Sequence, residues 1–143
     1  MFLGEYNHTI DAKGRLIIPS KYREALGNNF IVTKGLEGCL YVFERSEFDS
    51  FMDKLNEQSD FEARSRKMKR FFVTGAQEVE PDKQGRMLVS QVHRVYAGLD
   101  KDVVWAGVGN HFEIWDKQKW DENMNFDDID EIAESFAQVG IKF

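Results

Sequence analysis

Four basic side chains lie at two copies of one tight turn, and their types suit the recognition of phosphates or bases. The turns read Asp-Ala-Lys-Gly-Arg at residues 11–15 and Asp-Lys-Gln-Gly-Arg at residues 82–86. Their basic members are Lys13, Arg15, Lys83 and Arg86. A guanidinium is planar and can bond a phosphate or the edge of a guanine through two hydrogen bonds. Two such turns on one rigid object could therefore contact a DNA duplex at two points.

The same turns also fit a purely structural role. Each arginine could pair with the aspartate of its own turn and only fix the loop. Repetition does not separate the two interpretations, because a duplicated structural turn would look the same. Three more basic residues, on the predicted short helices, are typical of solvated helix charges and are second-rank candidates for DNA contacts. These are Lys21, Arg23 and Arg94.

A second basic cluster lies between the two turns and consists of Arg64, Arg66, Lys67, Lys69 and Arg70. Such a cluster could follow a phosphate backbone, since neutralised phosphates release counterions. It also fits a solvated helical face whose charges pair with the nearby acids at positions 57, 60 and 62. We favour this second interpretation.

Patterns typical of catalysis or metal binding are missing from the sequence. The turns at 35–38 and 107–109 lack the helix start and the lysine of a phosphate loop. No nucleophile motif surrounds Ser20, Ser90 or Cys39. The three histidines and the single cysteine have no zinc spacing. We therefore expect a protein that is not an enzyme, with no cofactor, no metal and no small-molecule substrate.

The two turns belong to a repeat that covers most of the chain. Residues 11–27 align with 82–98, and residues 31–48 align with 103–120 after one inserted residue. Each copy predicts a strand, the turn, a second strand, a short helix and two further strands. A unit of about 40 residues is too small to bury a core alone. We therefore predict a β-rich α+β fold in which two such units pack about a pseudo-two-fold axis and interleave their strands into one closed barrel.

Helices are expected around these two units. Apolar residues at helical spacing predict a first linker helix, and a second helical stretch is predicted over residues 61–72. The spaced residues are Phe48, Phe51, Met52 and Leu55. An apolar face over residues 127–139 predicts a final amphipathic helix.

The acidic charge is confined to the C-terminal end. The 143 residues include 19 basic and 25 acidic side chains and carry a net charge of -6. Seven acids against Lys142 lie in residues 120–143, so residues 1–119 are neutral. Overall acidity therefore does not exclude a nucleic-acid partner. The apolar runs are too short for a membrane span, and the start has no leader pattern, which predicts a cytoplasmic protein without a membrane partner.

Together these motifs resemble the MraZ family of bacterial transcriptional regulators. The likeness is carried by MFLGEYNHTIDAKGRLIIPSKYRE, RFFVTGAQEVEPDKQGR and NHFEIWDKQKW and covers residues 1 to about 120. It implies two SpoVT/AbrB-type halves, at 5–47 and 76–119, that form a swapped-hairpin barrel within one chain. A helical linker at 48–75 and an acidic C-terminal helix at 120–143 complete the chain. The resemblance also implies a homo-oligomer in the form of a ring.

The resemblance further implies sequence-specific binding to repeated short boxes in double-stranded DNA. These boxes lie in the promoter of the division and cell wall gene cluster, where the family usually represses transcription, which places the protein at the nucleoid. The family's DNA-facing residues lie in the two turns, which points to Lys13, Arg15, Lys83 and Arg86. Ser90 stands where the first copy has Pro19, so the second short helix is expected to start differently.

A protein-interaction module of the antitoxin type is the alternative function. In that hypothesis the barrel is a scaffold, and the acidic, amphipathic tail docks on a partner. The apolar face of the tail fits this role. It equally fits a helix that packs on its own barrel or on a neighbouring subunit, which we favour because exposed apolar stripes are costly.

Overall fold

The computed structural model describes residues 1–143. Its strands are β1 (Phe2–Thr9), β2 (Arg15–Ile17), β3 (Phe30–Lys34), β4 (Leu40–Phe43), β5 (Gln77–Val79), β6 (Arg86–Leu88), β7 (Asp102–Gly109) and β8 (Phe112–Asp116). Its α-helices are α1 (Arg23–Leu26), α2 (Arg45–Asn56), α3 (Ala63–Thr74), α4 (Gln91–Ala97), α5 (Lys117–Asn123) and α6 (Ile129–Ser135). Three short 3₁₀ segments are η1 (Ser20–Tyr22), η2 (Leu36–Gly38) and η3 (Phe136–Val139).

The two copies of the repeat exchange strands. An antiparallel sheet of six strands has the order β1-β7-β8-β4-β3-β5. Its outer pairs join the two halves, because β1 pairs with β7 and β5 pairs with β3. The fourth strands of the two halves, β4 and β8, also pair with each other. Each half therefore contributes its first strand to the other half, as the predicted interleaving requires.

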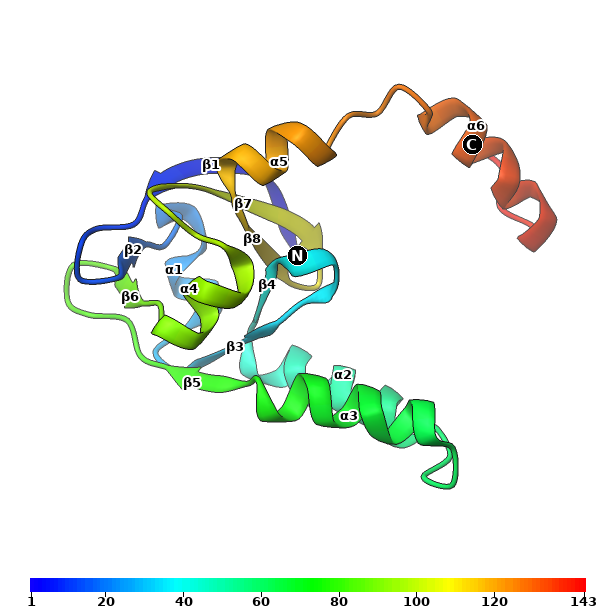
Figure 1. Cartoon of the computed structure of the whole chain (residues 1–143), viewed down its shortest axis with the longest axis horizontal. Helices are drawn as coiled ribbons and strands as arrows, with labels where there is room; N and C mark the ends of the chain where they lie inside the picture. The colour runs from blue at the N-terminus through cyan, green and yellow to red at the C-terminus, as the bar shows by residue number, and fades with distance from the viewer.

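The remaining two strands, β2 and β6, form a separate antiparallel ribbon. The predicted closed barrel is not found, because β1 and β5 are edges of the large sheet and have no common partner. The ribbon strands are only three residues long and bond to each other, so they do not close the gap between these edges. Figure 1 shows the ribbon at one end of the molecule.

The core lies between the inner side of the ribbon and the large sheet. Leu16 of β2 and Met87 of β6 are both buried in it, together with Phe30, Trp105 and Phe112 of the sheet. The ribbon is thus anchored by one apolar residue from the centre of each strand. This anchoring leaves its other face toward solvent.

The predicted linker helices are confirmed. The first is α2, where Phe48 and Phe51 contact Phe43 with ring centroids 5.7 Å and 5.1 Å apart. The second is α3, which begins and ends two residues later than predicted. None of the helices is both long enough and apolar enough to cross a membrane.

The short helices of the two halves start differently, as the exchange of Pro19 for Ser90 predicts. Ser90 caps α4, because its hydroxyl accepts a hydrogen bond from the backbone N–H of His93 at 3.3 Å. Pro19 has no such side chain, and the first half begins instead with the 3₁₀ turn η1. The capped α4 is a single helix of seven residues.

The predicted C-terminal helix forms α6 and continues as η3. The segment 125–143, which we call the C-terminal arm, stands away from the rest of the molecule (Figure 1). Within the arm, the rings of Phe136 and Phe143 pack with centroids 5.9 Å apart. The possibility that this helix packs on its own barrel is therefore wrong, and its apolar face stays exposed at Ile129, Ile132, Phe136 and Val139.

Candidate nucleic-acid interface

The first turn is held by its aspartate. One carboxylate oxygen of Asp11, Oδ1, accepts hydrogen bonds from the backbone amides of Lys13 and Arg15, both at 2.9 Å. The other oxygen, Oδ2, accepts a hydrogen bond from Nε of Arg15 at 2.6 Å. Gly14 has a φ of +82°, a left-handed conformation that glycine adopts without strain. The turn is therefore rigid and fixes the direction of Arg15.

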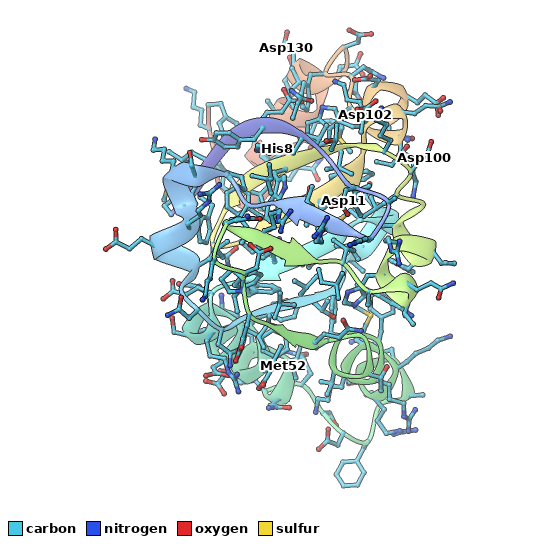
Figure 2. The ribbon with its side chains drawn as sticks, turned by 90° about the vertical axis from the view of Figure 1, so that its left-hand side faces the viewer. His8, Asp11, Met52, Asp100, Asp102 and Asp130 are labelled. Atoms are coloured by element: carbon cyan, nitrogen blue, oxygen red, sulfur yellow. The ribbon has the colours of Figure 1, made fainter.

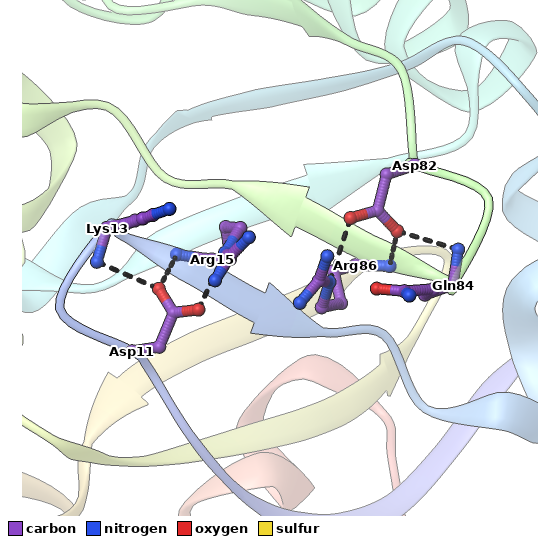
Figure 3. Close-up of polar contacts among 6 residues, drawn as sticks. All are labelled: Asp11, Lys13, Arg15, Asp82, Gln84 and Arg86. Atoms are coloured by element: carbon purple, nitrogen blue, oxygen red, sulfur yellow. Dashed lines mark hydrogen bonds and ion pairs between the residues drawn. The ribbon is translucent and has the colours of Figure 1, made fainter.

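The second turn repeats this geometry. Asp82 Oδ1 accepts hydrogen bonds from the amides of Gln84 and Arg86 at 2.9 Å, and its Oδ2 accepts one from Nε of Arg86 at 2.8 Å. Gly85 has a φ of +76°. Figure 3 shows the two networks at opposite ends of the ribbon. The structural interpretation of the turn arginines is thus correct as far as Nε is concerned.

The pairing leaves most of each guanidinium available. The terminal Nη atoms of Arg15 and Arg86 make no hydrogen bond within the chain, and the two side chains are 34% and 28% exposed. Fixing a guanidinium through Nε while leaving both Nη groups free presents a planar donor fork to an outside acceptor. The structural role and the DNA-binding role are therefore compatible.

The turn aspartates stay ionised to low pH. The backbone N–H of Arg15 and then its guanidinium lower the pKa of Asp11. The amide and guanidinium of Arg86 lower the pKa of Asp82 in the same way. At neutral pH both carboxylates are therefore charged and can hold the arginines.

The ribbon places both arginines on one face. Arg15 lies opposite Leu88, and Arg86 lies opposite Ile17. Because opposed residues of antiparallel strands share a face, all four side chains point away from the core. Ile17 is 41% exposed and Leu88 is 61% exposed. Figure 2 looks onto this side of the molecule and shows Asp11 near its centre.

Each half also supports the turn of the other half. The N–H of Ile18 donates to the carbonyl of Gly85 at 3.0 Å, and the N–H of Val89 donates to the carbonyl of Gly14 at 2.8 Å. The arginines of the two short helices, Arg23 of α1 and Arg94 of α4, likewise contact the turn of the opposite half. A Cβ at Gly14 would lie 3.1 Å from Cζ of Arg94, and a Cβ at Gly85 would overlap the guanidinium of Arg23.

These contacts change the role expected for two of the helix residues. Arg23 and Arg94 pack on the turn glycines of the opposite half and are not merely solvated helix charges. Nε of Arg23 donates to the carbonyl of Ile18 at 3.3 Å, whereas Nε of Arg94 is buried without a hydrogen-bond partner. Lys21 is different, because its ammonium lies 5.6 Å from the centre of the Tyr22 ring.

The candidate lysines of the two turns do not occupy equivalent positions. The amide of Lys13 binds Asp11 in the same way as the amide of Gln84 binds Asp82. Gln84 is therefore the structural counterpart of Lys13, and Lys83 is the counterpart of Ala12. The repeat alignment already contains this correspondence, since Lys13 and Gln84 both come two residues after the turn aspartate.

The basic cluster of α3 is a solvated helical face that is partly paired with nearby acids, which is the interpretation favoured from the sequence. Arg64 pairs with Glu62 at 2.7 Å, and Lys69 pairs with Asp60. Arg66 donates to the backbone carbonyl of Asp60 at 2.8 Å. Lys67 and Arg70 form no ion pair within the chain. The cluster lies on α3, away from the ribbon (Figure 1).

The cysteine, histidine and acidic side chains that could act as nucleophiles or metal ligands are buried or scattered. Burial raises the pKa of the Cys39 thiol, whose Sγ–H donates to the carbonyl of Leu36. His93 is buried, and its Nε2 lies 2.7 Å from the carbonyl of Gly75. No group of three or more histidine, cysteine or acidic side chains has a metal-binding arrangement. The ribbon face is therefore the main candidate site.

Comparison with known proteins identifies relatives along the whole chain. A family model described as "MraZ protein, putative antitoxin-like" matches residues 1–71 and again residues 72–137. A protein of Lachnoclostridium phytofermentans is 49% identical over all of both chains. Proteins of Acetivibrio thermocellus and Clostridium acetobutylicum are 50% and 49% identical over 99% of this chain and all of their own length. All three are named "Transcriptional regulator MraZ", a name that describes a regulator and not an enzyme.

Proposed function

The chain belongs to the MraZ family, and we propose that it regulates transcription by binding double-stranded DNA through the outer face of the β2–β6 ribbon. The observation that carries this proposal is the pair of guanidinium groups fixed through Nε on one face with their Nη groups free. The relatives' names support regulation, and the geometry of the ribbon supports the mode of binding.

The dimensions of the ribbon suit the major groove. That groove is about 12 Å wide and admits a two-stranded β-ribbon. Arg15 and Arg86 are diagonal neighbours across the two strands, and such neighbours are about 7–8 Å apart. Both guanidinium groups can therefore reach base edges within one groove. Lys83 lies in the second turn, and Arg23 and Arg94 lie against the turn glycines. We propose that these three residues contact the flanking phosphates.

Ile17 and Leu88 lie between the arginines on the ribbon face. An exposed apolar pair is costly in water but suits the floor of the major groove, where thymine methyl groups are apolar contacts. Neither residue was among the sequence candidates. The signal that could have found them is the strand period, which places positions 15 and 17 on one face.

Repetition of the ribbon in an oligomer would explain recognition of several DNA boxes. We propose a repressor that binds repeated short boxes in the promoter of the division and cell wall gene cluster, and hence a cytoplasmic, nucleoid-associated protein. The exchange of β1 and β5 supports two SpoVT/AbrB-type halves with swapped hairpins, at residues 5–47 and 76–119. The segments 48–75 and 120–143 are then the linker helices and the tail.

The C-terminal arm offers a way to assemble such an oligomer. Its exposed face is apolar, and it carries five acids and one lysine. The surface of α3 and α4 is complementary. Val92 and Val95 of α4 are 58% and 73% exposed. The unpaired Lys67 and Arg70 lie on α3, whose Phe71 ring packs against Tyr96 of α4 with centroids 6.1 Å apart. We propose that the arm docks on this surface of a neighbouring copy. A contact between two unlike surfaces repeats head to tail and closes as a ring when the rotation permits.

The exposed face of the arm also fits the alternative function, a module of the antitoxin type that docks on a different protein. The two hypotheses differ in what the arm binds. Recovery of partners from cells with the full chain and with a chain lacking residues 121–143 separates them. The alternative would be favoured if a different protein is recovered with the full chain but not with the shortened chain, and if self-association is the same for both.

A binding titration tests the proposed function. The probe is a labelled duplex from upstream of the protein's own gene, compared with an unrelated duplex of equal length. Arg15→Ala and Arg86→Ala should each weaken specific binding by about 1–3 kcal/mol, the usual contribution of a bidentate base contact. Both variants should keep the wild-type oligomeric state.

The matched control is Arg45→Ala. Arg45 pairs with Glu78 at 2.7 Å, away from the ribbon, so its removal should leave specific binding unchanged. Equal affinity of the folded Arg15→Ala, Arg86→Ala and wild-type proteins for the specific duplex would overturn the proposal.

A further inference from the structure

We infer that Gln84 is a specificity-determining residue and that one chain reads two unlike half-boxes, guanine at the Lys13 turn and adenine at the Gln84 turn. This inference rests on the proposed function, because it assumes that the ribbon face enters the major groove. It concerns the difference between the two turns, whereas the arginines are their shared feature.

The two positions are structurally equivalent. The amide of Lys13 and the amide of Gln84 each donate to Oδ1 of the turn aspartate at 2.9 Å. Each lies two residues before the turn arginine that binds Oδ2 of the same aspartate. The pseudo-two-fold axis of the ribbon, which passes between Leu16 and Met87, therefore relates Lys13 to Gln84.

Both side chains are available for an outside partner. Lys13 and Gln84 are exposed, and neither side chain makes a hydrogen bond within the chain. Figure 3 shows that both extend from the ends of the ribbon toward its middle, where the two arginines lie. They therefore point along the face that would lie on the bases.

Their chemistry selects different bases. The lysine ammonium carries only donors, which suit the O6 and N7 acceptors of guanine. A glutamine amide carries a donor and an acceptor, which match N7 and N6 of adenine in the major groove. Two turns with identical backbones thus present different reading groups. The half-box under Gln84 should contain adenine where the half-box under Lys13 contains guanine.

Directionality follows from this difference. A perfectly two-fold ribbon would select a palindromic box, in which either orientation of the chain is equivalent. With Lys13 at one end and Gln84 at the other, one orientation on the DNA is preferred. Copies related by rotation in an oligomer would then favour boxes repeated in the same direction.

Selection from a pool of random duplexes tests the inference with the full-length protein. The wild type should select a non-palindromic box, with a preference of roughly 5- to 150-fold for adenine over guanine at one position. Gln84→Lys should change that position to guanine, and Gln84→Ala should remove the preference. The double exchange, Lys13→Gln with Gln84→Lys, should select the same two bases in exchanged positions.

Gln58→Lys is the control, because it adds the same charge in the exposed segment after α2. It should tighten binding at most uniformly and select the wild-type box. Selection of one unchanged box by the wild type, Gln84→Lys and Gln84→Ala would overturn the inference and leave the proposed function standing. Selection of no box by the wild type would overturn both.

Discussion

At the residue scale, the turns depend on a left-handed backbone and on the side chain that packs against it. Gly85 has a φ of +76°, and the guanidinium of Arg23 from the other half lies where its Cβ would be. A substitution at this position therefore has two separate effects. One is the strain of the left-handed conformation, and the other is the displacement of Arg23.

Gly85→Ala separates these effects when it is compared with Gly27→Ala. Gly27 has a φ of +77° and no atom within 4 Å of its Cβ position. Both variants should lose about 1–3 kcal/mol of unfolding free energy from backbone strain. Only Gly85→Ala should also lose DNA affinity, because it moves Arg23 and the turn. Denaturant unfolding and the binding titration measure the two effects, and equal DNA affinity of both variants would contradict this account.

The contacts of several candidate residues could not be predicted by reading single positions. The sequence predicted Arg15 and Arg86 from the duplicated turn, and the structure brings both to one face of the ribbon. The contact of Arg23 with Gly85 and of Arg94 with Gly14 depends on the exchange between halves. No local pattern contains that exchange. The equivalence of Lys13 and Gln84, by contrast, was available from the repeat alignment.

At the element scale, the junction of α3 and α4 depends on a buried histidine. The carbonyl of Gly75 only accepts hydrogen bonds, so Nε2 of His93 must be the donor in the 2.7 Å contact. Burial, followed by the nearby charge of Lys34, lowers the pKa of His93 from 6.5. The folded state therefore resists protonation, while the unfolded chain binds a proton as the pH falls below about 6.5. The contribution of His93 to the unfolding free energy should accordingly be fully present above this pH. It should decrease as the pH falls toward the lowered pKa of the folded state.

Thermal and denaturant unfolding between pH 7.5 and 5 checks this prediction. One such group contributes at most about 1.4 kcal/mol per pH unit to the slope of the unfolding free energy against pH. Burial also lowers the pKa values of His8 and His111, so the wild-type slope includes them. His93→Gln keeps an N–H donor for Gly75 and should reduce the slope. A slope as steep as that of the wild type would show that His93 does not contribute.

The elements with strong periodicity were predictable, and the closure of the fold was not. The helices α3 and α6 begin two residues after their predicted starts, and α2 contains the predicted apolar spacing of Phe48, Phe51, Met52 and Leu55. The repeat predicted that strands of the two halves interleave. The predicted barrel closure failed because it depends on strand length and pairing partners. With three residues each, β2 and β6 pair only with each other and do not join the two sheet edges, β1 and β5.

At the scale of the whole molecule, charge and apolar surface are distributed in separate regions. The ribbon with its turn arginines lies at one end of the molecule, and the acidic arm extends from the other (Figure 1). A net charge of -6 located in residues 120–143 therefore does not oppose DNA at the ribbon directly. In the proposed assembly this acidic segment faces Lys67 and Arg70 on α3 of a neighbouring copy.

Removal of residues 125–143 tests this role of the arm. In the proposed assembly the arm makes its apolar contacts with another copy, so the truncated chain should lose self-association. Lys67→Glu with Arg70→Glu in the full chain should weaken association for the same electrostatic reason. Sedimentation velocity measures both effects. The oligomer should dissociate without loss of the folded body, since the arm stands apart from it, and an unchanged oligomer in the truncated chain would contradict the proposal.

The entry of the ribbon into the major groove is the central claim, and methylation protection tests it most directly. Dimethyl sulfate modifies N7 of guanine in the major groove and N3 of adenine in the minor groove. With the full-length protein on DNA from upstream of its own gene, guanine N7 atoms should be protected at evenly spaced boxes, and Arg15→Ala with Arg86→Ala should abolish this protection. Protection of adenine N3 with unprotected guanine N7 in the bound DNA would contradict it.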